Sequence, residues 1–439
     1  MHYALLIMNY LYLCKQKSKN MKHLLTIISA ILLFTACSKD DDGPLTPPEP
    51  EAAHRTVIVY MVGENNLDNN LDSYMRKDIN EMRQGRKQVA ASENLVLYVD
   101  KLSKTEMPFI AKINTDGNLD TLYRYEKDFY SSNPDSMIIV INRIYQMCPA
   151  KDYGLVLWGH ATGWLMEDSV ATHRGYGIDT GNNDLPTYYD EQSHAYMYAG
   201  KWLNIPSMRE AFKKLPFKWK FILGDCCNMM NVEDGYELRE VTDYLIGSPA
   251  EIPGNGSPYN TVVPAMFQQN ENFYEAVIDA YGDAYPGYVP LSVINTSWME
   301  ALAEETRPLL SRLNEYVNNE SNLMANHVYY NNTFVDGKRK HIMFDVLEVV
   351  RKAFADEPAK YDNWYQVFKR AVPYNRIAEM WSTNSHIAIN FSDFTVTEDY
   401  FSGVSMFFPM DQYTYEEWSC NEAVKKMSWY YAAGWPSLD

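Results

Sequence analysis

The sequence predicts an α/β fold in which a mostly parallel central sheet is flanked by helices. Apolar runs at 55–62, 154–158 and 221–224 have the length and composition of buried strands. Segments with helical periodicity alternate with such runs, which is typical of a doubly wound sheet. In a sheet of this kind, ligands bind beside the carboxyl ends of the parallel strands. Chemically active side chains are therefore sought where these runs end.

The first half of the chain supplies most of the expected strands. Apolar residues recur at helical spacing within 67–82, so a helix is expected after the first strand. Asp116-Gly117 between two short apolar segments indicates a hairpin. The expected elements are strand 55–62, helix 67–82, strand 94–99, hairpin strands 109–113 and 121–125, helix 136–146 and strand 154–158.

The second half opens on an irregular stretch, 167–200, that is rich in glycine, aspartate and tyrosine. Helical segments dominate 270–372, with a less regular part at 329–336. We therefore expect a largely helical C-terminal portion from residue 270 onward. The other expected elements are helix 205–215, strand 221–227, helix 232–241, strand 244–248 and two late strands, 385–391 and 402–408.

The N-terminus resembles a bacterial lipoprotein signal peptide. Lys22 precedes an apolar stretch, 24–34, that is too short to span a bilayer. Thr35-Ala36-Cys37 follows, and small residues before a cysteine resemble a lipobox. We expect lipidation of Cys37, which would tether the protein by acyl chains. The alternative is a plain secretory signal whose cysteine is incidental.

A lysine followed by acids in 38–42 resembles the surface-export signal of Bacteroidetes lipoproteins. An outer-membrane lipoprotein exposed at the cell surface is expected, with its lipid anchor as the only membrane contact. The net charge of −18 argues against a nucleic-acid partner. The predicted division is a leader and signal peptide, 1–37, a disordered linker, 38–54, and a folded domain, 55–439, with its helical extension from 270.

The four cysteines beyond the leader do not predict a disulfide framework, because they are few and scattered in a large domain. No CxxC or HExxH spacing occurs in the sequence, so a zinc site has little support. The four cysteines are Cys148, Cys226, Cys227 and Cys420.

A histidine and a cysteine follow two of the buried runs. His160 comes after 154–158, and Cys227 comes after 221–224. If both runs are parallel strands, imidazole and sulfur meet at one edge of the sheet, as a thiolate nucleophile and its general acid/base require. The pattern predicts a cysteine peptidase. Alternation along the strand places Cys227 on the face of Asp225 and turns Cys226 into the core.

Five blocks of sequence, in order, resemble the clostripain family of cysteine peptidases. They are 55–61 with Asn65-Asn66-Leu67-Asp68, then Leu157-Trp158-Gly159-His160-Ala161-Thr162-Gly163-Trp164, 225–229 with 236–239, 248–259 and 403–409. The resemblance implies a caspase-like α/β sandwich and an endopeptidase that acts on protein or peptide substrates. It also implies that His160 is the catalytic histidine and Cys227 the nucleophile.

By the same resemblance, the oxyanion hole is formed by the main-chain N–H groups of Cys227 and Ala161. Ala161 stands where the family usually has glycine. Alanine keeps the N–H, but a backbone that requires positive φ would be strained there. We therefore expect an effect on efficiency rather than a change of chemistry.

Asp225 resembles the acid at the base of the family's S1 pocket, which implies cleavage after Arg or Lys. Its alternative role is a helix cap or a hydrogen-bonded turn acid. Asn255, a second substrate-binding candidate, stands where many relatives have an acid. The family's self-cleavage stretch contains Arg174 and Lys201, of which Arg174 is favoured.

The resemblance implies no required cofactor, although some relatives need calcium. Acid-rich loops here offer ligands, but no EF-hand spacing assigns a site. Two other functions stay open: a weak or inactive surface lipoprotein that binds peptide or glycan with the same fold, and a thiol oxidoreductase using Cys226 and Cys227. The oxidoreductase lacks the two-residue spacer between its cysteines.

Overall fold

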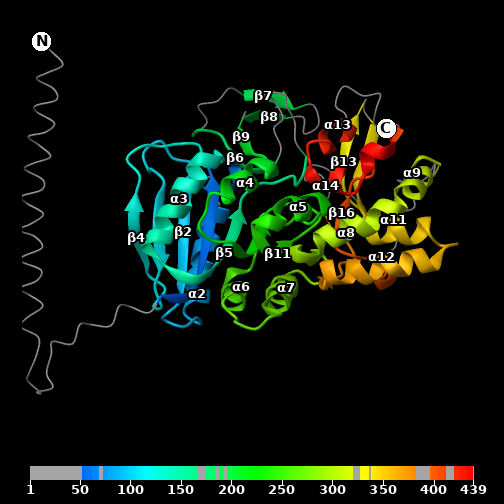
Figure 1. The fold of residues 1–439 in the computed structure, drawn as a ribbon. Coiled ribbons are helices and arrows are strands. Elements are labelled where there is room, and N and C mark those ends of the chain that lie inside the picture. The colour runs from blue at the N-terminus through cyan, green and yellow to red at the C-terminus, as the bar shows by residue number, and fades with distance from the viewer. Residues whose placement is uncertain are drawn as a thin grey trace, which may run out of the picture. The chain divides into compact units, whose positions relative to one another are not determined.

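The computed structural model describes residues 52–68, 73–165, 175–182, 187–190, 195–198, 200–319, 327–335, 338–381, 396–411 and 420–438. Residues 52–439 form one compact unit around a nine-stranded sheet (Figure 1). Cys37, Arg174 and the expected strand 385–391 lie outside the described residues. In the part that is described, no helix has the length and apolar character needed to cross a membrane.

The central sheet has parallel strands in its middle and antiparallel strands at both sides. Its order is β15-β12-β11-β10-β5-β1-β2-β3-β4, and the run from β11 to β2 is parallel. The strands are β1 (Ala53–Gly63), β2 (Asn94–Lys101), β3 (Phe109–Ile113), β4 (Leu119–Arg124), β5 (Ala150–Trp158), β10 (Trp219–Asp225), β11 (Thr242–Gly247), β12 (Leu291–Asn295) and β15 (Tyr374–Arg376). Because β5 and β10 are neighbours in the middle, both are buried on two faces.

Helices cover both faces of the sheet, as alternate side chains of β5 require. Leu155 and Leu157 pack in one apolar cluster, whereas Val156 and Trp158 pack in another. The first cluster includes α3 (Pro134–Met147), α4 (Ile205–Phe212), α5 (Val232–Glu237), α8 (Met299–Thr306), α9 (Leu310–Asn319), α11 (Val346–Ala353), α12 (Pro358–Ala371), α13 (Cys420–Val424) and α14 (Ser428–Ala432). The second includes α2 (Tyr74–Arg86), α6 (Tyr259–Met266) and α7 (Phe273–Ala284).

Three smaller sheets complete the described strands. β13 (Tyr329–Val335), β14 (Lys338–Asp345) and β16 (Ser405–Met406) form one, β6 (Tyr176–Asp179) pairs with β9 (Lys201–Leu203), and β7 (Thr187–Asp190) pairs with β8 (Ala195–Tyr198). The hydroxyl of Tyr176 shares its one proton between the carbonyl oxygens of Tyr60 (2.9 Å) and Trp158 (3.1 Å) in a bifurcated hydrogen bond. This bond fixes β6 beside the carboxyl ends of β1 and β5.

The prediction of a helix from residue 67 is wrong in its start. Asn66–Asp68 form a 3-10 turn, and α2 begins at Tyr74, where the Ser73 side chain accepts from the N–H of Arg76. A hydroxyl cap supplies one of the hydrogen bonds that the first helical turn lacks, so it fixes where the helix starts. The apolar spacing of 67–82 did not reveal this boundary.

The prediction that helices dominate 270–372 is also incomplete. β12 lies in this region and pairs antiparallel with β11, and β13 with β14 forms a hairpin where only an irregular part was expected. β12 has five residues, and periodicity cannot separate such a short buried run from helix. The late strand expected at 402–408 is reduced to the two residues of β16.

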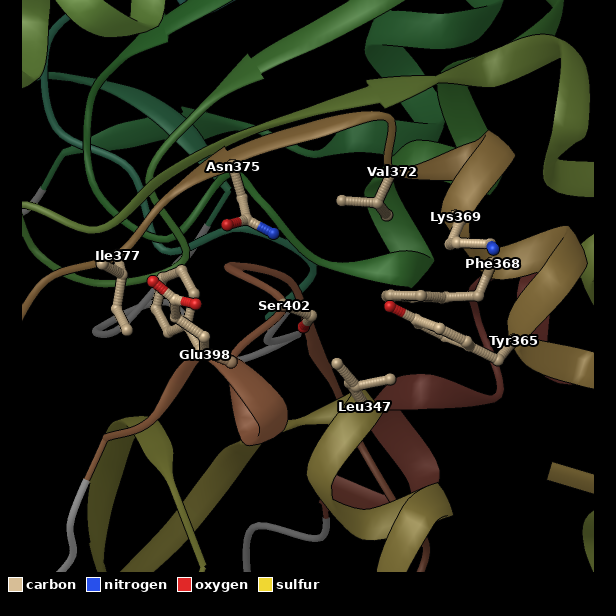
Figure 2. A pocket seen from close by; sticks show the side chains of 10 residues that line it. Leu347, Tyr365, Phe368, Lys369, Val372, Asn375, Ile377, Glu398 and Ser402 are labelled. Atoms are coloured by element: carbon tan, nitrogen blue, oxygen red, sulfur yellow. The ribbon is translucent and has the colours of Figure 1, made fainter. Parts of the chain in front are cut away.

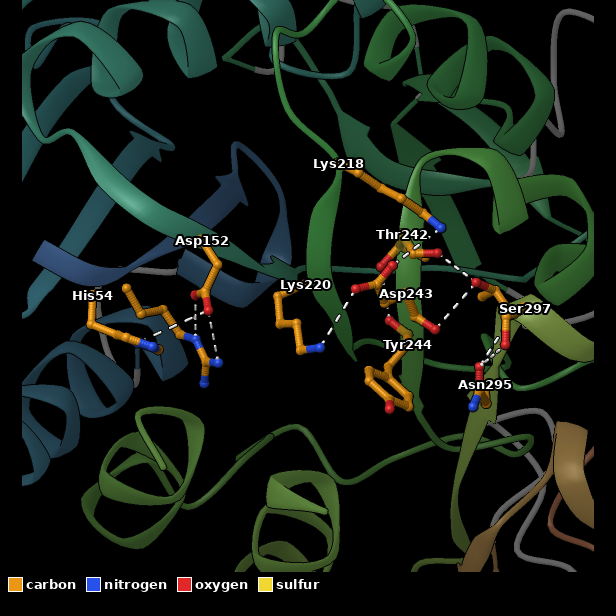
Figure 3. A network of polar contacts seen from close by, with 11 residues as sticks. His54, Asp152, Lys218, Lys220, Thr242, Asp243, Tyr244, Asn295 and Ser297 are labelled. Carbon is orange, nitrogen blue, oxygen red and sulfur yellow. Dashed lines mark hydrogen bonds and ion pairs between the residues drawn. The ribbon is translucent and has the colours of Figure 1, made fainter. Parts of the chain in front are cut away.

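The amino ends of the parallel strands, which we call the amino edge, carry paired charges. Arg55 of β1 donates from Nε to Asp152 of β5 at 2.6 Å, and its guanidinium also reaches the carbonyl oxygen of Met266. At β10 and β11, Lys218 and Lys220 lie 3.2 and 3.5 Å from the Asp243 carboxylate (Figure 3). These ion pairs join neighbouring strands. None of the predicted site residues takes part in them.

Candidate active site

The register of β5 and β10 brings the predicted histidine and cysteine to the same edge of the sheet. Trp158, the last residue of β5, pairs with Asp225, the last residue of β10. His160 and Cys227 each follow this pair by two residues, on neighbouring parallel strands. Both are partly exposed at the carboxyl ends of the strands, which we call the carboxyl edge. The sequence therefore predicted the location of both side chains.

The imidazole of His160 is held by the turn that follows β1. Its Nε2 lies 2.8 Å from Oδ1 of Asn66. The adjacent Asn65 fixes this turn, since its Nδ2 donates to the carbonyl oxygens of Val62 (3.0 Å) and Ile178 (2.9 Å). Burial lowers the pKa of His160 to about 4, so the ring is neutral at pH 7. Asn66 was not predicted as a site residue, although it lies in a block that resembles the family.

The sulfur of Cys227 lies beside the loop that follows β11. The N–H of Ile252 points at its Sγ, 3.4 Å away. Burial, together with the nearby carboxylate of Glu251, raises the pKa of Cys227 to about 12. The resting pair is therefore a neutral thiol and a neutral imidazole.

Cys226 is a core residue, as alternation predicted. Its side chain is 1% exposed and belongs to the same apolar cluster as Met229 and Tyr176. The structure differs in one detail, because β10 ends at Asp225 and both cysteines lie in the turn beyond it. Asn228 closes this turn with a φ of 60°, a left-handed conformation that asparagine tolerates.

Gly163 brings the histidine segment into contact with the cysteine segment. Its φ is 64°, and a Cβ placed there would lie 2.2 Å from the carbonyl oxygen of Asn228 and 2.8 Å from Nδ2 of Asn231. Carbon atoms do not approach a backbone oxygen so closely. Only glycine fits, so the separation of the two segments depends on this residue.

The backbone strain expected at Ala161 is not present. Among the described residues other than glycine, only Asn182 and Asn228 have positive φ. Ala161 forms an isolated antiparallel bridge with Tyr176, flanked by bonds from Thr162 N to Gly175 O (2.9 Å) and from Gly177 N to His160 O (2.8 Å). These two bonds bypass Ala161, so the bridge does not use its N–H.

Asp225 is buried and braces the loop that carries Asn255. Its Oδ1 accepts from the N–H of Ser257 (2.8 Å) and the hydroxyl of Tyr281 (3.3 Å), and its Oδ2 accepts from the hydroxyl of Tyr259 (2.5 Å). A carboxylate offers about four acceptor positions, so three donors leave one for a further partner. Burial raises the pKa of Asp225 to about 6.

Gly256 lies close against this carboxylate, where a larger residue would not fit. A Cβ on Gly256, whose φ is 58°, would lie 2.9 Å from Oδ2 of Asp225. Asn255 beside it is exposed. Asp225 therefore makes the hydrogen bonds expected of a turn acid. These bonds do not exclude a second role for the same carboxylate in a substrate pocket.

Two acids on α2 lie near Asp225 and were not predicted. Asp78 accepts from Nε1 of Trp158 at 2.6 Å, and Glu81 accepts from the N–H of Tyr259 at 3.0 Å. Burial and the Asp225 carboxylate raise the pKa of Asp78 to about 9, so Asp225 carries the charge at pH 7. These acids come from a helix whose sequence shows only its apolar spacing.

Lys201, a predicted self-cleavage position, is exposed in β9, where it pairs with Asp179. Its Nζ lies 3.5 Å from the centroid of the Tyr130 ring. A peptide bond in a paired strand must leave the sheet before a protease can bind it. Arg174 precedes the described segment 175–182.

A separate cavity of about 320 Å³ lies between α11, α12 and the 3-10 turn at Glu398–Tyr400 (Figure 2). Tyr365 and Phe368 of α12 extend into it from one side, and Leu347 and Glu398 line it from other elements. None of the predicted site residues lines this cavity. It is not part of the candidate active site.

Comparison with known proteins identifies a single family. The clostripain family profile matches residues 59–439. A secreted C11 cysteine protease from Bacteroides thetaiotaomicron, solved with an irreversible peptide inhibitor, is 28% identical, with 88% of this chain and 100% of that chain covered and a TM-score of 0.67. No curated protein matches the chain.

Two further solved structures share the fold. An inactive zymogen C11 protease from Parabacteroides distasonis is 23% identical over 88% of this chain and 99% of that chain, with a TM-score of 0.67. A second secreted C11 cysteine protease from Bacteroides thetaiotaomicron is 20% identical over 87% and 99%, with a TM-score of 0.66. The predicted caspase-like α/β sandwich is confirmed.

Proposed function

The chain belongs to the clostripain family and is a cysteine-type peptidase, and from this premise we propose that it cleaves peptide bonds after Arg or Lys with Cys227 and His160. The observation that carries the proposal is the pairing of Trp158 with Asp225, which brings both side chains to one edge on adjacent strands. Protein and peptide substrates follow from the family.

In the proposed reaction, His160 accepts the proton of Cys227 as the sulfur attacks the scissile carbonyl carbon. The attack forms a tetrahedral intermediate, which collapses to an acyl-enzyme when His160 protonates the leaving amine. Water then hydrolyses the thioester with His160 as base. Because Asn66 holds Nε2 of the ring in the resting structure, Asn66 is proposed to orient the imidazole.

The oxyanion is proposed to accept hydrogen bonds from the N–H groups of Cys227 and Ala161. The N–H of Ala161 is available because its bridge to Tyr176 does not use it. Its ordinary backbone conformation removes the objection that alanine would be strained there.

Specificity for a basic side chain is proposed to come from Asp225. The open acceptor position on its carboxylate and the absence of a side chain at Gly256 leave room for a guanidinium or ammonium group. Asn255 lies on the same loop and is proposed to line the pocket as a neutral side chain.

Two exchanges at adjacent cysteines test the nucleophile. We expect Cys227→Ala to lose at least about 10⁴-fold in turnover of arginyl and lysyl fluorogenic peptides, as removal of a catalytic nucleophile does. Cys226→Ala is the matched control and should stay active, because it changes only a buried core residue. Activity retained by Cys227→Ala, or lost in a folded Cys226→Ala protein, would refute the assignment.

Anchoring and maturation are proposed on sequence grounds. Cys37 is proposed to carry the lipid that tethers the protein to the outer membrane. A metabolic lipid label that is incorporated by the parent protein and absent from Cys37→Ala would support this.

Self-cleavage is proposed at Arg174 rather than at Lys201, which lies in a paired strand. Intact mass before and after incubation, compared with Cys227→Ala, tests it; a clip in both proteins would exclude self-processing.

A further inference from the structure

The turn that carries Cys227 is held from its inner side by a buried asparagine that the proposed mechanism does not use. This residue, Asn231, is fully buried. Its Nδ2 donates to the carbonyl oxygen of Asn228 (3.0 Å) and to Oδ2 of Asp234 (2.7 Å). Its Oδ1 accepts from the N–H of Asp234 (2.7 Å). Both protons of the amide nitrogen and the amide oxygen are therefore used in hydrogen bonds.

The partners of the Asn231 amide fix which way it points. The carbonyl of Asn228 can only accept a hydrogen bond, and the main-chain N–H of Asp234 can only donate one. The nitrogen must therefore face the cysteine turn, and the oxygen must face the first turn of α5. Asn231 is the N-cap of α5, and a cap needs only an acceptor. The bond from Nδ2 to Asn228 is additional to the cap.

Asn228 directly follows the nucleophile in an unfavourable backbone conformation. Its φ of 60° is left-handed, which costs more than a right-handed conformation for any residue with a Cβ. Two bonds hold it: its N–H donates to the carbonyl oxygen of Ala250 (3.0 Å), and its own carbonyl accepts from Asn231. Without the second bond, Asn228 is anchored on one side only and can relax. Cys227 shares a peptide group with Asn228, so its sulfur and N–H would move as well.

The same amide lies where the cysteine segment touches the segment that follows His160. A Cβ on Gly163 would lie 2.2 Å from the carbonyl oxygen of Asn228 and 2.8 Å from Nδ2 of Asn231. The backbone of Asn231 is itself held by an isolated parallel bridge to Ser405 of β16. Asn231 is therefore packed against both reactive segments and joined to a third.

Asp234 acts on this amide as an acceptor. It is fully buried, and its Oδ1 accepts no hydrogen bond. Burial raises the pKa of Asp234 well above its usual range, which favours the neutral carboxyl. A neutral amide of the same shape could therefore replace it, whereas a methyl group could not.

We propose that Asn231 is a positioning residue, which holds the turn of Cys227 in place through the carbonyl of Asn228, with Asp234 orienting its amide. Its effect on turnover rests on the proposed function, whereas its effect on the turn does not. Asn231 does not act on substrate. It sets the distance between the segments that carry sulfur and imidazole.

Serine at position 231 separates this role from helix capping. Asn231→Ser keeps an oxygen that can cap α5 but has no amide nitrogen for Asn228, so its melting temperature should stay within about 2 °C of the parent. A small displacement of a catalytic group is costly, so kcat for arginyl and lysyl peptides should fall by about 10- to 100-fold. KM should stay within about twofold.

Asn133→Ser is the matched control, because Asn133 caps α3 with its side chain and is exposed. It should leave kcat unchanged. The proposal is overturned if Asn231→Ser keeps the parent's kcat, if Asn133→Ser loses as much, or if only KM rises. Asp234→Asn should restore most of the turnover that Asp234→Ala loses; an equal loss in both would remove Asp234 from the proposal.

Hydrogen exchange tests the turn without activity. The N–H groups of Asn228 and Met230 donate to Ala250 and Ser248, so both are protected in the parent. In Asn231→Ser, exchange of a peptide that spans 226–231 should accelerate at least about tenfold, and in Asn133→Ser it should not. Unchanged exchange would overturn the proposal whatever the turnover. Accelerated exchange would support it even if Cys227→Ala stayed active and the proposed function failed.

Discussion

The two edges of the central sheet differ in the partners of their acidic side chains. At the amino edge, Arg55 faces Asp152 and Lys220 faces Asp243, so buried or half-buried charges have opposite partners (Figure 3). At the carboxyl edge, Asp225 is buried and accepts hydrogen bonds from neutral donors only, and burial raises its pKa. Paired charges stabilise a fold, whereas unpaired buried acids are available to a ligand.

The largest expected effect of breaking this contrast is at Asp225. Asp225→Asn keeps the shape and one acceptor but removes the charge, so kcat/KM for arginyl and lysyl peptides should fall by about 30-fold to several thousandfold. A peptide with citrulline, the neutral isostere of arginine, is the control and should lose far less. An equal loss for both peptides would assign Asp225 to bracing the loop alone.

The second largest effect concerns pH. Because the pKa of Cys227 is raised to about 12, its thiolate fraction should rise tenfold for each pH unit below that value. Alkylation of the resting enzyme by iodoacetamide, followed by mass spectrometry, should therefore accelerate about a hundredfold between pH 7 and pH 9. A rate that is flat over this range and falls in His160→Ala would instead indicate a preformed thiolate–imidazolium pair.

At the amino edge, the expected effect is on stability rather than on activity. Asp152→Asn leaves the guanidinium of Arg55, which is 2% exposed, facing a neutral amide. We expect a loss of about 1–3 kcal/mol in the free energy of unfolding, measured by urea titration of the Cys227→Ala protein. Turnover by the otherwise intact enzyme should not change. A turnover defect without loss of stability would contradict the division between the edges.

A smaller effect on turnover is expected for Asn66. Asn66→Ala removes the hydrogen bond to Nε2 of His160, and one such bond corresponds to about a tenfold fall in kcat. KM should stay within about twofold, because Asn66 is not proposed to contact substrate. A rise in KM with kcat unchanged would place Asn66 in substrate binding instead.

The smallest effect is expected for Lys220. Its ammonium lies 3.5 Å from Asp243 and is 32% exposed, so solvent screens the pair. Lys220→Ala should change the free energy of unfolding by less than about 1 kcal/mol and leave turnover unchanged. A loss as large as that of Asp152→Asn would mean that burial does not decide how much an amino-edge ion pair contributes.

Much of the site could be predicted because its residues follow long apolar runs. β5 and β10 are buried on both faces, so their sequences identify them, and the residues after them fall at one edge by topology. The assignment of Cys226 to the core followed from alternation alone.

The missed residues depend on contacts between distant segments. Asn66 meets His160 across 94 positions of sequence, and Asp225 meets Tyr281 across 56. The acids of α2 near Asp225 and the short strand β12 gave no local pattern that separates them from ordinary surface or helical residues. Tertiary packing alone brings them into position.

Gly163 offers a route by which a homologue of this protein could lose its activity through a single substitution outside the catalytic residues. A single methyl group at that position would push apart the two peptide segments that touch through it, although neither sulfur nor imidazole changes. The pairing of β5 with its neighbours would not change, because Gly163 lies beyond the last residue of that strand. A homologue with alanine at this position is expected to fold but to lack peptidase activity, because its equivalents of Cys227 and His160 would lie too far apart.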